Sequence, residues 1–305
     1  MISVIFPVFN EQDNLDKLYD TLNQVVNKVP RIKFEFIFVD DCSTDRSPEI
    51  LQKLNAKDER VKIIRFSRNF GSHTALSAGF HHSKGDCAIV LASDLQDPPD
   101  LILKLVEKWE RGSKVVWAVR SKREGESFST KIFSKLYNFL LNILTDIKVP
   151  PLGTDVFLAD RIVIDAYKNV VEKHSSIYLI FAWLGFPQDQ IEYVKEARYK
   201  GKSNWTIGDK FKLVIDSILS FSYLPVRFIS ILGVMTAFLG FIYASLVFWN
   251  FIHGEPVQGW SSLMVTILIV GGIVMIMLGV LGEYLWRTFD ESRRRPHYII
   301  EYQIE

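Results

Sequence analysis

Two long stretches without a charged side chain constrain the fold of this chain more than any other feature. No residue from Phe228 to Ile252 carries a full charge, and none does from Pro256 to Gly282. About 20 apolar residues in a helix span a bilayer core of ~30 Å, so each stretch is long enough to cross a membrane. Buried helices of a soluble core are rarely so long and so free of charge. We therefore predict transmembrane helices at 228–252 and 262–286, joined by an external loop at 253–261.

Basic residues flank the two predicted spans on one side only. Arg227 precedes the first span, and Arg287 and Arg293–Arg295 follow the second. The connecting segment HGEPVQGWSS, which begins at His253, has no Lys or Arg. Because basic flanks stay in the cytoplasm, we predict a multi-pass protein of the inner (plasma) membrane with both termini cytoplasmic. Residues 287–305 would form a cytoplasmic tail.

The part of the chain before the spans alternates between apolar runs and helical segments. The runs that predict strands are Ser3–Phe9, Phe34–Asp40, Val61–Ser67, Asp86–Ala92 and Lys114–Arg120. They are nearly continuous, as in strands that helices cover on both faces. The segments that suit helices include Asp13–Val29, Ser47–Lys57, Ser72–His82 and Pro98–Arg111. This alternation predicts a doubly wound, parallel α/β sheet in a cytoplasmic domain at 1–205.

Polar side chains follow every predicted strand. They are Asn10 and Glu11, Asp40 and Asp41, Arg68 and Asn69, Asp94, and Arg120. In open α/β sheets, ligands bind at the edge formed by the carboxyl ends of the strands. We therefore predict a ligand site at that edge.

Three carboxylates follow the fourth predicted strand in the stretch VLASDLQDPPD. Pro98 suits the first position of a helix, which makes Asp97 the expected N-cap. Asp100 would lie in the first turn, where a carboxylate interacts favourably with the helix dipole. Asp94 has no such structural task, and with Gln96 beside it we expect it to bind a cation.

The kind of ligand follows from what the chain lacks. There is no GxGxxG after the first strand and no GxxxxGK[ST], which disfavours a dinucleotide fold and a P-loop. A carboxylate-rich site holds phosphate through a hard divalent cation, Mg²⁺ or Mn²⁺. Arg120 and Arg123 would neutralise the remaining charge, so we infer a nucleotide diphosphate. The formal charge of +1 gives no bias toward nucleic acid.

Six motifs then point to a family. In order they are PVFNE (Pro7–Glu11), VDDCSTD (Val39–Asp45), SRNFGSHTALSAGF (Ser67–Phe80), SDLQDPPD (Ser93–Asp100), VRSKREGES (Val119–Ser127) and RYKGKSNW (Arg198–Trp205). With the two spans, nearly the whole chain resembles the polyisoprenyl-phosphate glycosyltransferases of glycosyltransferase family 2. That group includes dolichol-phosphate mannose synthases and bacterial bactoprenol glucosyltransferases. The resemblance implies a GT-A-type, Rossmann-like nucleotide-binding domain.

The resemblance also implies roles for single residues. Those expected to contact the nucleotide are Pro7, Phe9, Glu11, Asp41, Ser93, Asp94 and Arg120. Asp94 occupies the last position of an Asp-x-Asp metal motif, with Gln96 as co-ligand. Arg120 and Arg198 match arginines that hold diphosphate or lipid phosphate. Asp155 would lie near the acceptor.

The chain departs from the family pattern at three positions. Ala92 stands where the motif has its first Asp, so Asp97 is kept as a further metal candidate. Phe157 replaces the Arg of an F-R-L element. Asn204 replaces a Lys, so Lys200 or Lys202 would supply that charge.

The expected reaction transfers a sugar from a nucleotide sugar to a polyprenyl phosphate, with inversion. A phosphate monoester has a second pKa of ~6 and is already largely dianionic, so it needs little base catalysis. Asp155 is therefore expected to orient the acceptor. UDP-glucose is the favoured donor, while UDP-GlcNAc, a UDP-aminopentose and GDP-mannose stay open. A non-catalytic nucleotide sensor also stays open, whereas the absent QxxRW element disfavours a processive synthase.

A lipid acceptor requires a site at the bilayer surface. The segment at 128–148 has the spacing of an interfacial amphipathic helix, although a core-packed helix is the alternative. A second amphipathic helix is expected at 206–227. Small residues in the second span, Gly271, Gly272 and Gly279, favour helix packing. The expected partners are therefore membrane lipid, further copies in a homo-oligomer such as a tetramer, and a flippase for the product.

Overall fold

The computed structural model describes residues 1–122, 154–170, 172, 176–195, 224–253 and 259–305. These residues belong to two compact units. The α/β unit comprises the described residues up to 195 together with Pro296–Glu305, and the helical unit comprises those from 224 to 295. The chain thus leaves the α/β unit for the helical unit and returns to the α/β unit at its end.

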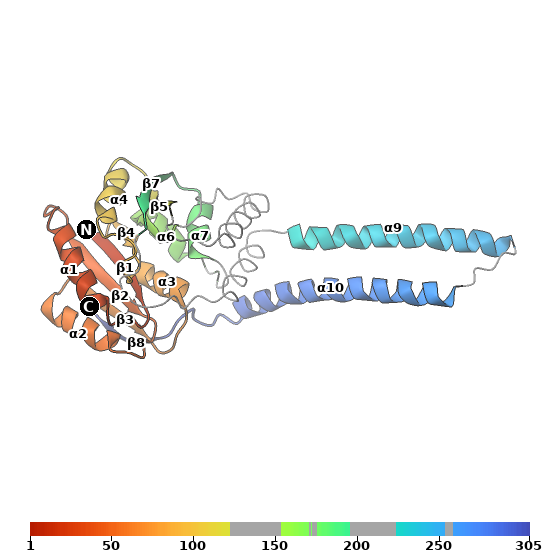
Figure 1. Cartoon of the computed structure of the whole chain (residues 1–305), viewed down its shortest axis with the longest axis horizontal. Coiled ribbons are helices and arrows are strands. Elements are labelled where there is room, and N and C mark those ends of the chain that lie inside the picture. The colour runs from red at the N-terminus through yellow and green to blue at the C-terminus, as the bar shows by residue number, and fades with distance from the viewer. Residues whose placement is uncertain (123–153, 171, 173–175, 196–223, 254–258) are drawn as a thin grey trace. The chain divides into compact units, whose positions relative to one another are not determined.

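One mixed sheet forms the centre of the α/β unit (Figure 1). Its strands are β1 (Ile2–Val8), β2 (Phe34–Asp40), β3 (Val61–Phe66), β4 (Cys87–Val90), β5 (Val115–Lys122), β6 (Val156–Asp160), β7 (Gln188–Val194) and β8 (Ile300–Ile304). Its helices are α1 (Leu15–Val26), α2 (Ser47–Lys57), α3 (Ser72–His82), α4 (Leu101–Glu110), α6 (Arg161–Lys168) and α7 (Ile177–Trp183). The order across the sheet is β7-β5-β6-β4-β1-β2-β3-β8.

The strands β4, β1, β2 and β3 form the predicted parallel sheet. β1 pairs in parallel with β2 and β4, and β2 pairs in parallel with β3. Every residue of β2 is buried, as expected for a strand that is covered on both faces. The five predicted strands and four predicted helices are therefore confirmed, with differences only at their ends.

Strands β6 and β8 correct the prediction of a wholly parallel sheet. β6 lies between β4 and β5 and is antiparallel to both, and β8 is antiparallel to β3. Phe157 of β6 is paired with Val90 of β4, so β6 begins beside the end of β4. Residues that precede β6 therefore share an edge with residues that follow β4 and β5.

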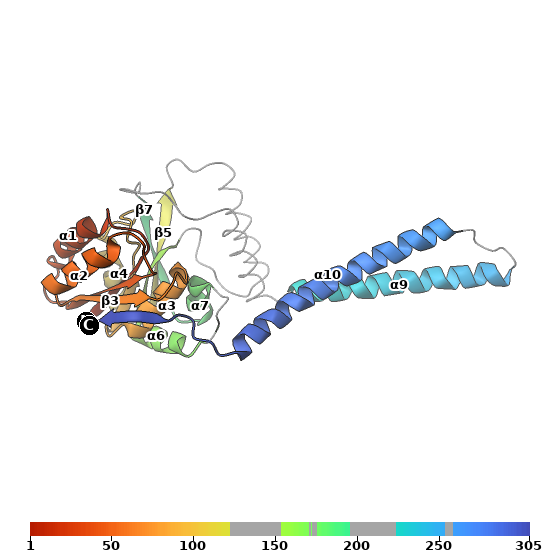
Figure 2. The ribbon, with the colours of Figure 1, turned by 90° about the horizontal axis from the view of Figure 1, so that it is seen from below.

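Helices cover both faces of the sheet (Figure 2). Helices α1, α2 and α4 contribute to one buried cluster with alternate residues of β1, among them Val4 and Phe6. Helix α3 packs on the opposite face, where Gly79 lies against Ile5. A Cβ atom at Gly79 would lie 2.3 Å from Ile5 Cγ2, so only glycine allows this close approach.

The chain end, predicted only as a tail, forms part of the sheet. Besides the β8 pairing, Ser67 N donates a hydrogen bond of 3.0 Å to Ile299 O. The rings of Phe66 and Tyr298 stack with centroids 5.0 Å apart. Residues 298–304 thus close the sheet beside β3, after the second long helix has ended.

The helical unit contains α9 (Leu224–Ile252) and α10 (Trp260–Ser292), which lie side by side in Figures 1 and 2. A Cβ atom at Gly233 of α9 would lie 3.3 Å from Met277 Cε of α10. Both helices contain segments long and apolar enough to cross a membrane, Val226–Asn250 and Ser262–Ser292. Most of their large apolar side chains are exposed, which suits a lipid environment.

Candidate active site

Three non-glycine residues with left-handed backbone mark the carboxyl edge of the parallel strands. Asn10 follows β1 with φ of 57°, Cys42 follows β2 with φ of 60°, and Leu95 follows β4 with φ of 60°. Such conformations are uncommon outside glycine and are frequently found at functional sites. The chain therefore turns sharply where the polar residues were predicted to gather.

Asp41 connects the loop after β2 to the residues just before α3 through hydrogen bonds. Its two carboxylate oxygens accept hydrogen bonds from Phe70 N at 2.7 Å and Gly71 N at 2.8 Å. Burial raises the pKa of the Asp41 carboxyl to about 6, against the opposing effect of these two bonds. The residue shapes the edge through the backbone, and its contact with a base stays a prediction.

The neighbouring Asp40 has a structural role. It is fully buried, pairs with the guanidinium of Arg65 and accepts a hydrogen bond of 3.0 Å from Ser43 N. Arg65 Nε also donates to Glu301 Oε2 of β8 at 2.8 Å, and its Nη2 donates to Ser43 O at 3.2 Å. The C-terminal strand is thus linked through one arginine to the loop after β2.

Other residues predicted to contact nucleotide surround the end of β1. The Ser93 hydroxyl donates to Pro7 O at 2.8 Å, which joins β1 to the loop after β4. Glu11 N donates to Ser47 Oγ at 2.9 Å at the start of α2. Phe9 is half-buried directly after β1. These residues share the predicted edge, and their binding to nucleotide stays a prediction.

Asp94 and Gln96 are the predicted metal ligands. Asp94 is buried in the loop after β4, and its Oδ1 accepts a hydrogen bond of 3.1 Å from Gln96 N. Within the part of the chain that the structure describes, no three His, Cys, Asp or Glu residues are grouped so that they could hold a metal ion. A carboxylate and an amide oxygen suit Mg²⁺ or Mn²⁺. They fit a cation that takes its other ligands from a diphosphate and water, rather than one enclosed by protein.

The prediction that Asp97 caps α4 is wrong. The helix begins at Leu101, with Asp100 at the N-cap position and its carboxylate 2.8 Å from Lys28 Nζ. Asp100 is therefore not in the first turn either. The physical reason is the Pro-Pro pair, because a residue that precedes proline, here Pro98, is disfavoured in helical conformation.

Asp97 instead belongs to a charged cluster where β5 ends, β6 begins and β7 ends. The charged cluster comprises Asp97, Arg120, Asp155, Tyr193 and Lys195. The Tyr193 hydroxyl donates to Asp97 Oδ1 at 2.6 Å. Arg120 pairs with the Asp155 carboxylate. Lys195 Nζ lies 3.2 Å from Asp155 Oδ2 and 3.7 Å from Asp97 Oδ1. Two predicted site residues, Arg120 and Asp155, are thus in direct contact.

The charged cluster is largely buried. The side chains of Asp97 and Arg120 are 0% and 6% exposed, whereas that of Asp155 is 49% exposed. Burial and the charge of Asp97 raise the pKa of the Tyr193 hydroxyl, against the opposing effect of Arg120, so it stays a proton donor. Asp97 Oδ2 and Arg120 Nε have no hydrogen-bond partner in the described part of the chain. Buried polar atoms without partners fit a site that a polar ligand completes.

Sequence reasoning missed Tyr193 and Lys195 because it missed β7. This strand pairs in parallel with β5, and the pairing sets Tyr193 opposite Arg120. The available signal was the alternation in QDQIEYV, whose residues are mostly exposed or half-buried, as on an edge strand. His73 Nδ1 accepts a hydrogen bond of 3.3 Å from Ile177 N. It therefore joins α3 to α7.

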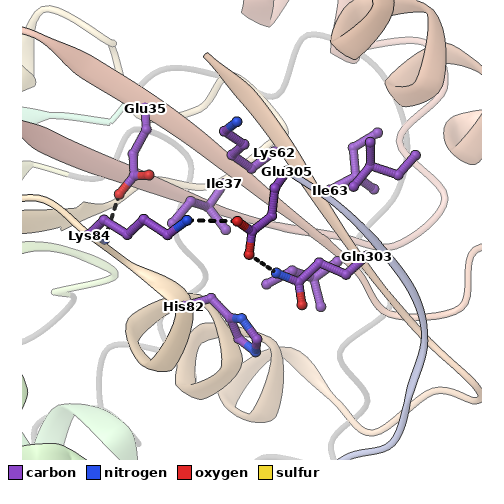
Figure 3. Close-up of a pocket in the computed structure, with 10 residues that line it drawn as sticks. Glu35, Ile37, Lys62, Ile63, His82, Lys84, Gln303 and Glu305 are labelled. Carbon is purple, nitrogen blue, oxygen red and sulfur yellow. Dashed lines mark hydrogen bonds and ion pairs between the residues drawn. The ribbon is translucent and has the colours of Figure 1, made fainter. Parts of the chain in front are cut away.

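A separate pocket lies at the amino ends of β2 and β3 (Figure 3). Lys84 Nζ lies 2.7 Å from Glu305 Oε2, and Lys84 N donates to Glu35 Oε1 at 2.7 Å. Gln303 Nε2 donates to the other Glu305 oxygen at 2.8 Å. The pocket is lined by none of the predicted site residues, and we place the candidate site at the opposite edge.

The sequence profile described as Glycosyl transferase family 2 matches residues 3–167. The chain belongs to glycosyltransferase family 2. An uncharacterized glycosyltransferase of Bacillus subtilis, YkcC, is 40% identical over 99% of this chain and 94% of its own. A prophage bactoprenol glucosyl transferase homolog of Escherichia coli is 35% identical over 98% of both chains.

One solved structure illustrates the more distant similarity. Glucosyl-3-phosphoglycerate synthase from Mycobacterium tuberculosis is 18% identical over 70% of this chain and 75% of its own, with a TM-score of 0.48. Family membership itself rests on the profile and the full-length relatives. The protein is therefore a glycosyltransferase with a GT-A-type α/β domain, followed by two long apolar helices.

Phe157, which was predicted to replace the arginine of an F-R-L element, lies in the core. Its side chain in β6 is fully buried. Its ring centroid lies 4.9 Å from that of Trp117 and 5.0 Å from that of Phe181. No cation enters the site from this position, so the charged cluster supplies its cations from β5 and from the residue after β7.

Several predictions lie outside the described residues. They concern Arg123, Arg198, Lys200 and Lys202 as phosphate-binding residues, the interfacial helix at 128–148 and positions 206–223 of the juxtamembrane helix.

Proposed function

We propose that this glycosyltransferase moves glucose from UDP-glucose to undecaprenyl phosphate or a similar polyprenyl phosphate. One observation carries the proposal. The bactoprenol glucosyl transferase of Shigella phage SfV is 35% identical over 98% of this chain and 98% of its own, so the similarity includes the two apolar helices. A lipid acceptor accounts for helices that a soluble acceptor would not require.

The reaction needs positioning more than proton transfer. An oxygen of the acceptor phosphate forms a bond to the anomeric carbon, and the bond from that carbon to the diphosphate oxygen breaks. The nucleoside diphosphate leaves with the electron pair, and the configuration inverts. Because the attacking phosphate is already anionic, the main task is to hold two mutually repelling anions in line.

The residues at the strand ends divide this task. Asp94 and Gln96 would hold Mg²⁺ or Mn²⁺ against the diphosphate, and the cation would offset the charge of the leaving group. Arg120 comes from the end of β5 and would hold a phosphate by two oxygens, as its planar guanidinium allows. Asp155 would orient the acceptor. Pro7, Phe9, Glu11, Asp41 and Ser93 would form the nucleotide pocket.

The proposed site faces the cytoplasm at the inner membrane. Arg227 lies near the start of α9 and Arg293–Arg295 follow α10, which favours a hairpin with both ends inside. We further propose a homo-oligomer, because a Cβ atom at Gly271, Gly272 or Gly279 would meet no atom of the described residues within 4 Å. A flippase would carry the lipid-linked sugar outward for modification of a cell-envelope glycan.

A panel of donors tests the proposal. The full-length protein, in detergent with Mg²⁺ and a short polyprenyl phosphate, would receive UDP-glucose, UDP-GlcNAc, a UDP-aminopentose or GDP-mannose. The expected result is a lipid-linked hexose, detected by mass, with UDP-glucose only. A product from another donor would reassign the sugar, and no product from any donor would reject the lipid acceptor.

A further inference from the structure

Lys195, the first residue after β7, was not among the residues that the family motifs single out. Its side chain is 15% exposed, whereas lysine usually keeps its ammonium group in water. The Nζ atom lies 3.2 Å from Asp155 Oδ2 and 3.7 Å from Asp97 Oδ1. Because β7 runs parallel to β5 with Tyr193 opposite Arg120, this lysine lies beside the end of β5. The charged cluster thus contains a second, mostly buried cation.

Arg120 and Lys195 share one carboxylate oxygen. Both ion pairs are made to Oδ2 of Asp155. The two cations are 6% and 15% exposed, but the Asp155 side chain is 49% exposed. The cations therefore belong to the protein side of the site, and the shared carboxylate reaches them from the solvent side.

The shared Asp155 carboxylate does not accept hydrogen bonds from all the donors of the Arg120 guanidinium. Arg120 Nε is buried and has no hydrogen-bond partner among the described residues. A guanidinium presents its donors as a planar fork that matches two oxygens of a phosphate. A phosphate group has enough oxygens to reach Arg120 Nε, its Nη2 and the Lys195 ammonium together. The donors are thus better matched to a phosphate than to the carboxylate they now hold.

We propose that Arg120 and Lys195 form a phosphate subsite whose anion position is occupied by the Asp155 carboxylate until a substrate phosphate displaces it. Two mostly buried cations without counter-ions would be strongly unfavourable. In the resting protein Asp155 pairs with both Arg120 and Lys195, and the buried Asp97 remains beside Lys195 when Asp155 is displaced. Asp155 is also the most exposed of the three, so it can leave at the least cost. The displaced carboxylate is then available to orient the acceptor. This inference rests on the proposed function for the source of the phosphate, either the lipid acceptor or the donor diphosphate.

If phosphate displaces Asp155, removing the charge of Asp155 and removing the charge of its partner Lys195 should change phosphate affinity in opposite directions. Removing the charge of Asp155 removes a competitor, so a phosphate ligand should bind more tightly. Removing the charge of Lys195 removes a binding group, so the ligand should bind more weakly. An ion pair with a purely structural role would make both variants bind more weakly.

The test measures dissociation constants of two probes, UDP and farnesyl phosphate, with the full-length protein in detergent. We expect Asp155→Asn to lower Kd for the responsive probe by about two- to tenfold. Lys195→Met should raise that Kd by about tenfold or more, and Lys195→Arg should keep it near the wild-type value. A response with UDP assigns the subsite to the diphosphate, and a response with farnesyl phosphate assigns it to the acceptor.

Asp189→Asn is the matched control. Asp189 pairs with Lys108 Nζ at 2.9 Å near the start of β7, away from the charged cluster, and its loss should leave both Kd values unchanged. Asp155→Ala provides a second removal of the charge if the Asn variant does not fold. Weaker or unchanged binding of both probes by the Asp155 variants would overturn the subsite. If the wild-type protein transfers sugar but these shifts are absent, only this inference fails. If it binds neither probe, the proposed function fails as well.

Discussion

The two sides of the sheet edge are built in different ways. On the β1–β2–β3 side, the carboxylates of Asp40 and Asp41 are buried and bonded to backbone N–H groups, and Asp40 also to Arg65. On the β5–β6–β7 side, Arg120 and Lys195 are held by Asp155, a half-exposed carboxylate. The first arrangement fixes loops, whereas the second can exchange partners. We infer that the nucleotide meets a rigid surface and the reacting phosphates meet an adjustable one.

The largest expected effect follows from removing the ion pair between Arg65 and Asp40 on the β1–β2–β3 side. Arg65→Met would leave Asp40 buried without its counter-ion and should lower the free energy of unfolding by about 3–5 kcal/mol. Glu301→Gln removes the half-exposed partner of the same arginine and should cost less than about 1 kcal/mol. Thermal unfolding of the full-length protein, followed by circular dichroism, would measure both. Equal losses would show that the C-terminal strand, and not Asp40, accounts for the role of Arg65.

The next effect concerns Asp94, in the loop after β4 between the two sides. Asp94→Ala should lower the rate of sugar transfer by about 100-fold, since the charge on the leaving diphosphate would lose its stabilisation. Asp100→Ala is the control, because Asp100 lies in the same segment but pairs with Lys28 at the protein surface. The comparison uses transfer rates at saturating substrate. Equal rates for the Asp94 variant and the wild type would show that Asp94 has no role in sugar transfer.

A smaller effect tests how much the Tyr193 hydroxyl stabilises the buried Asp97 on the β5–β6–β7 side. Tyr193→Phe removes the hydroxyl that donates to Asp97 Oδ1 at 2.6 Å. An unsatisfied buried carboxylate oxygen should cost about 1–3 kcal/mol of unfolding free energy. Unfolding midpoints would show this loss, and an unchanged midpoint would mean that Lys195 alone holds Asp97.

A last effect, which leaves the candidate site untouched, is a pH dependence at the contact between α3 and α7. Burial lowers the pKa of the His73 imidazole to about 4, below its ordinary value of ~6.5. The folded state therefore prefers neutral His73, and its contribution is complete above pH 6.5 and is lost as the pH falls toward 4. The difference in unfolding midpoint between wild type and His73→Gln should shrink over that window. A constant difference from pH 7 to 4.5 would contradict this account.

The same division of the sheet explains what the sequence could predict. Strands β1 to β4 are near-continuous apolar runs separated by helical segments, so their order and the polar residues at their ends were readable. β6 has only five residues and runs antiparallel, and β7 is a polar edge strand. Asp155 was therefore found only through the family resemblance, and Tyr193 and Lys195 were not found.

Asp97 and the C-terminal strand show two further limits. The DPP pattern predicts a helix cap, but burial against Tyr193 gives Asp97 a different role. β8 lies more than two hundred residues beyond β3, its partner, and beyond both long helices. Local pattern cannot predict such a pairing, because it depends on where the chain re-enters the α/β unit.

The most direct test of the central claim is the release of free UDP from UDP-glucose by the purified full-length protein. The account predicts rapid release only when polyprenyl phosphate and Mg²⁺ are both present, with an equal amount of lipid-linked glucose. Release that does not depend on the lipid phosphate, or no release under any of these conditions, would contradict it.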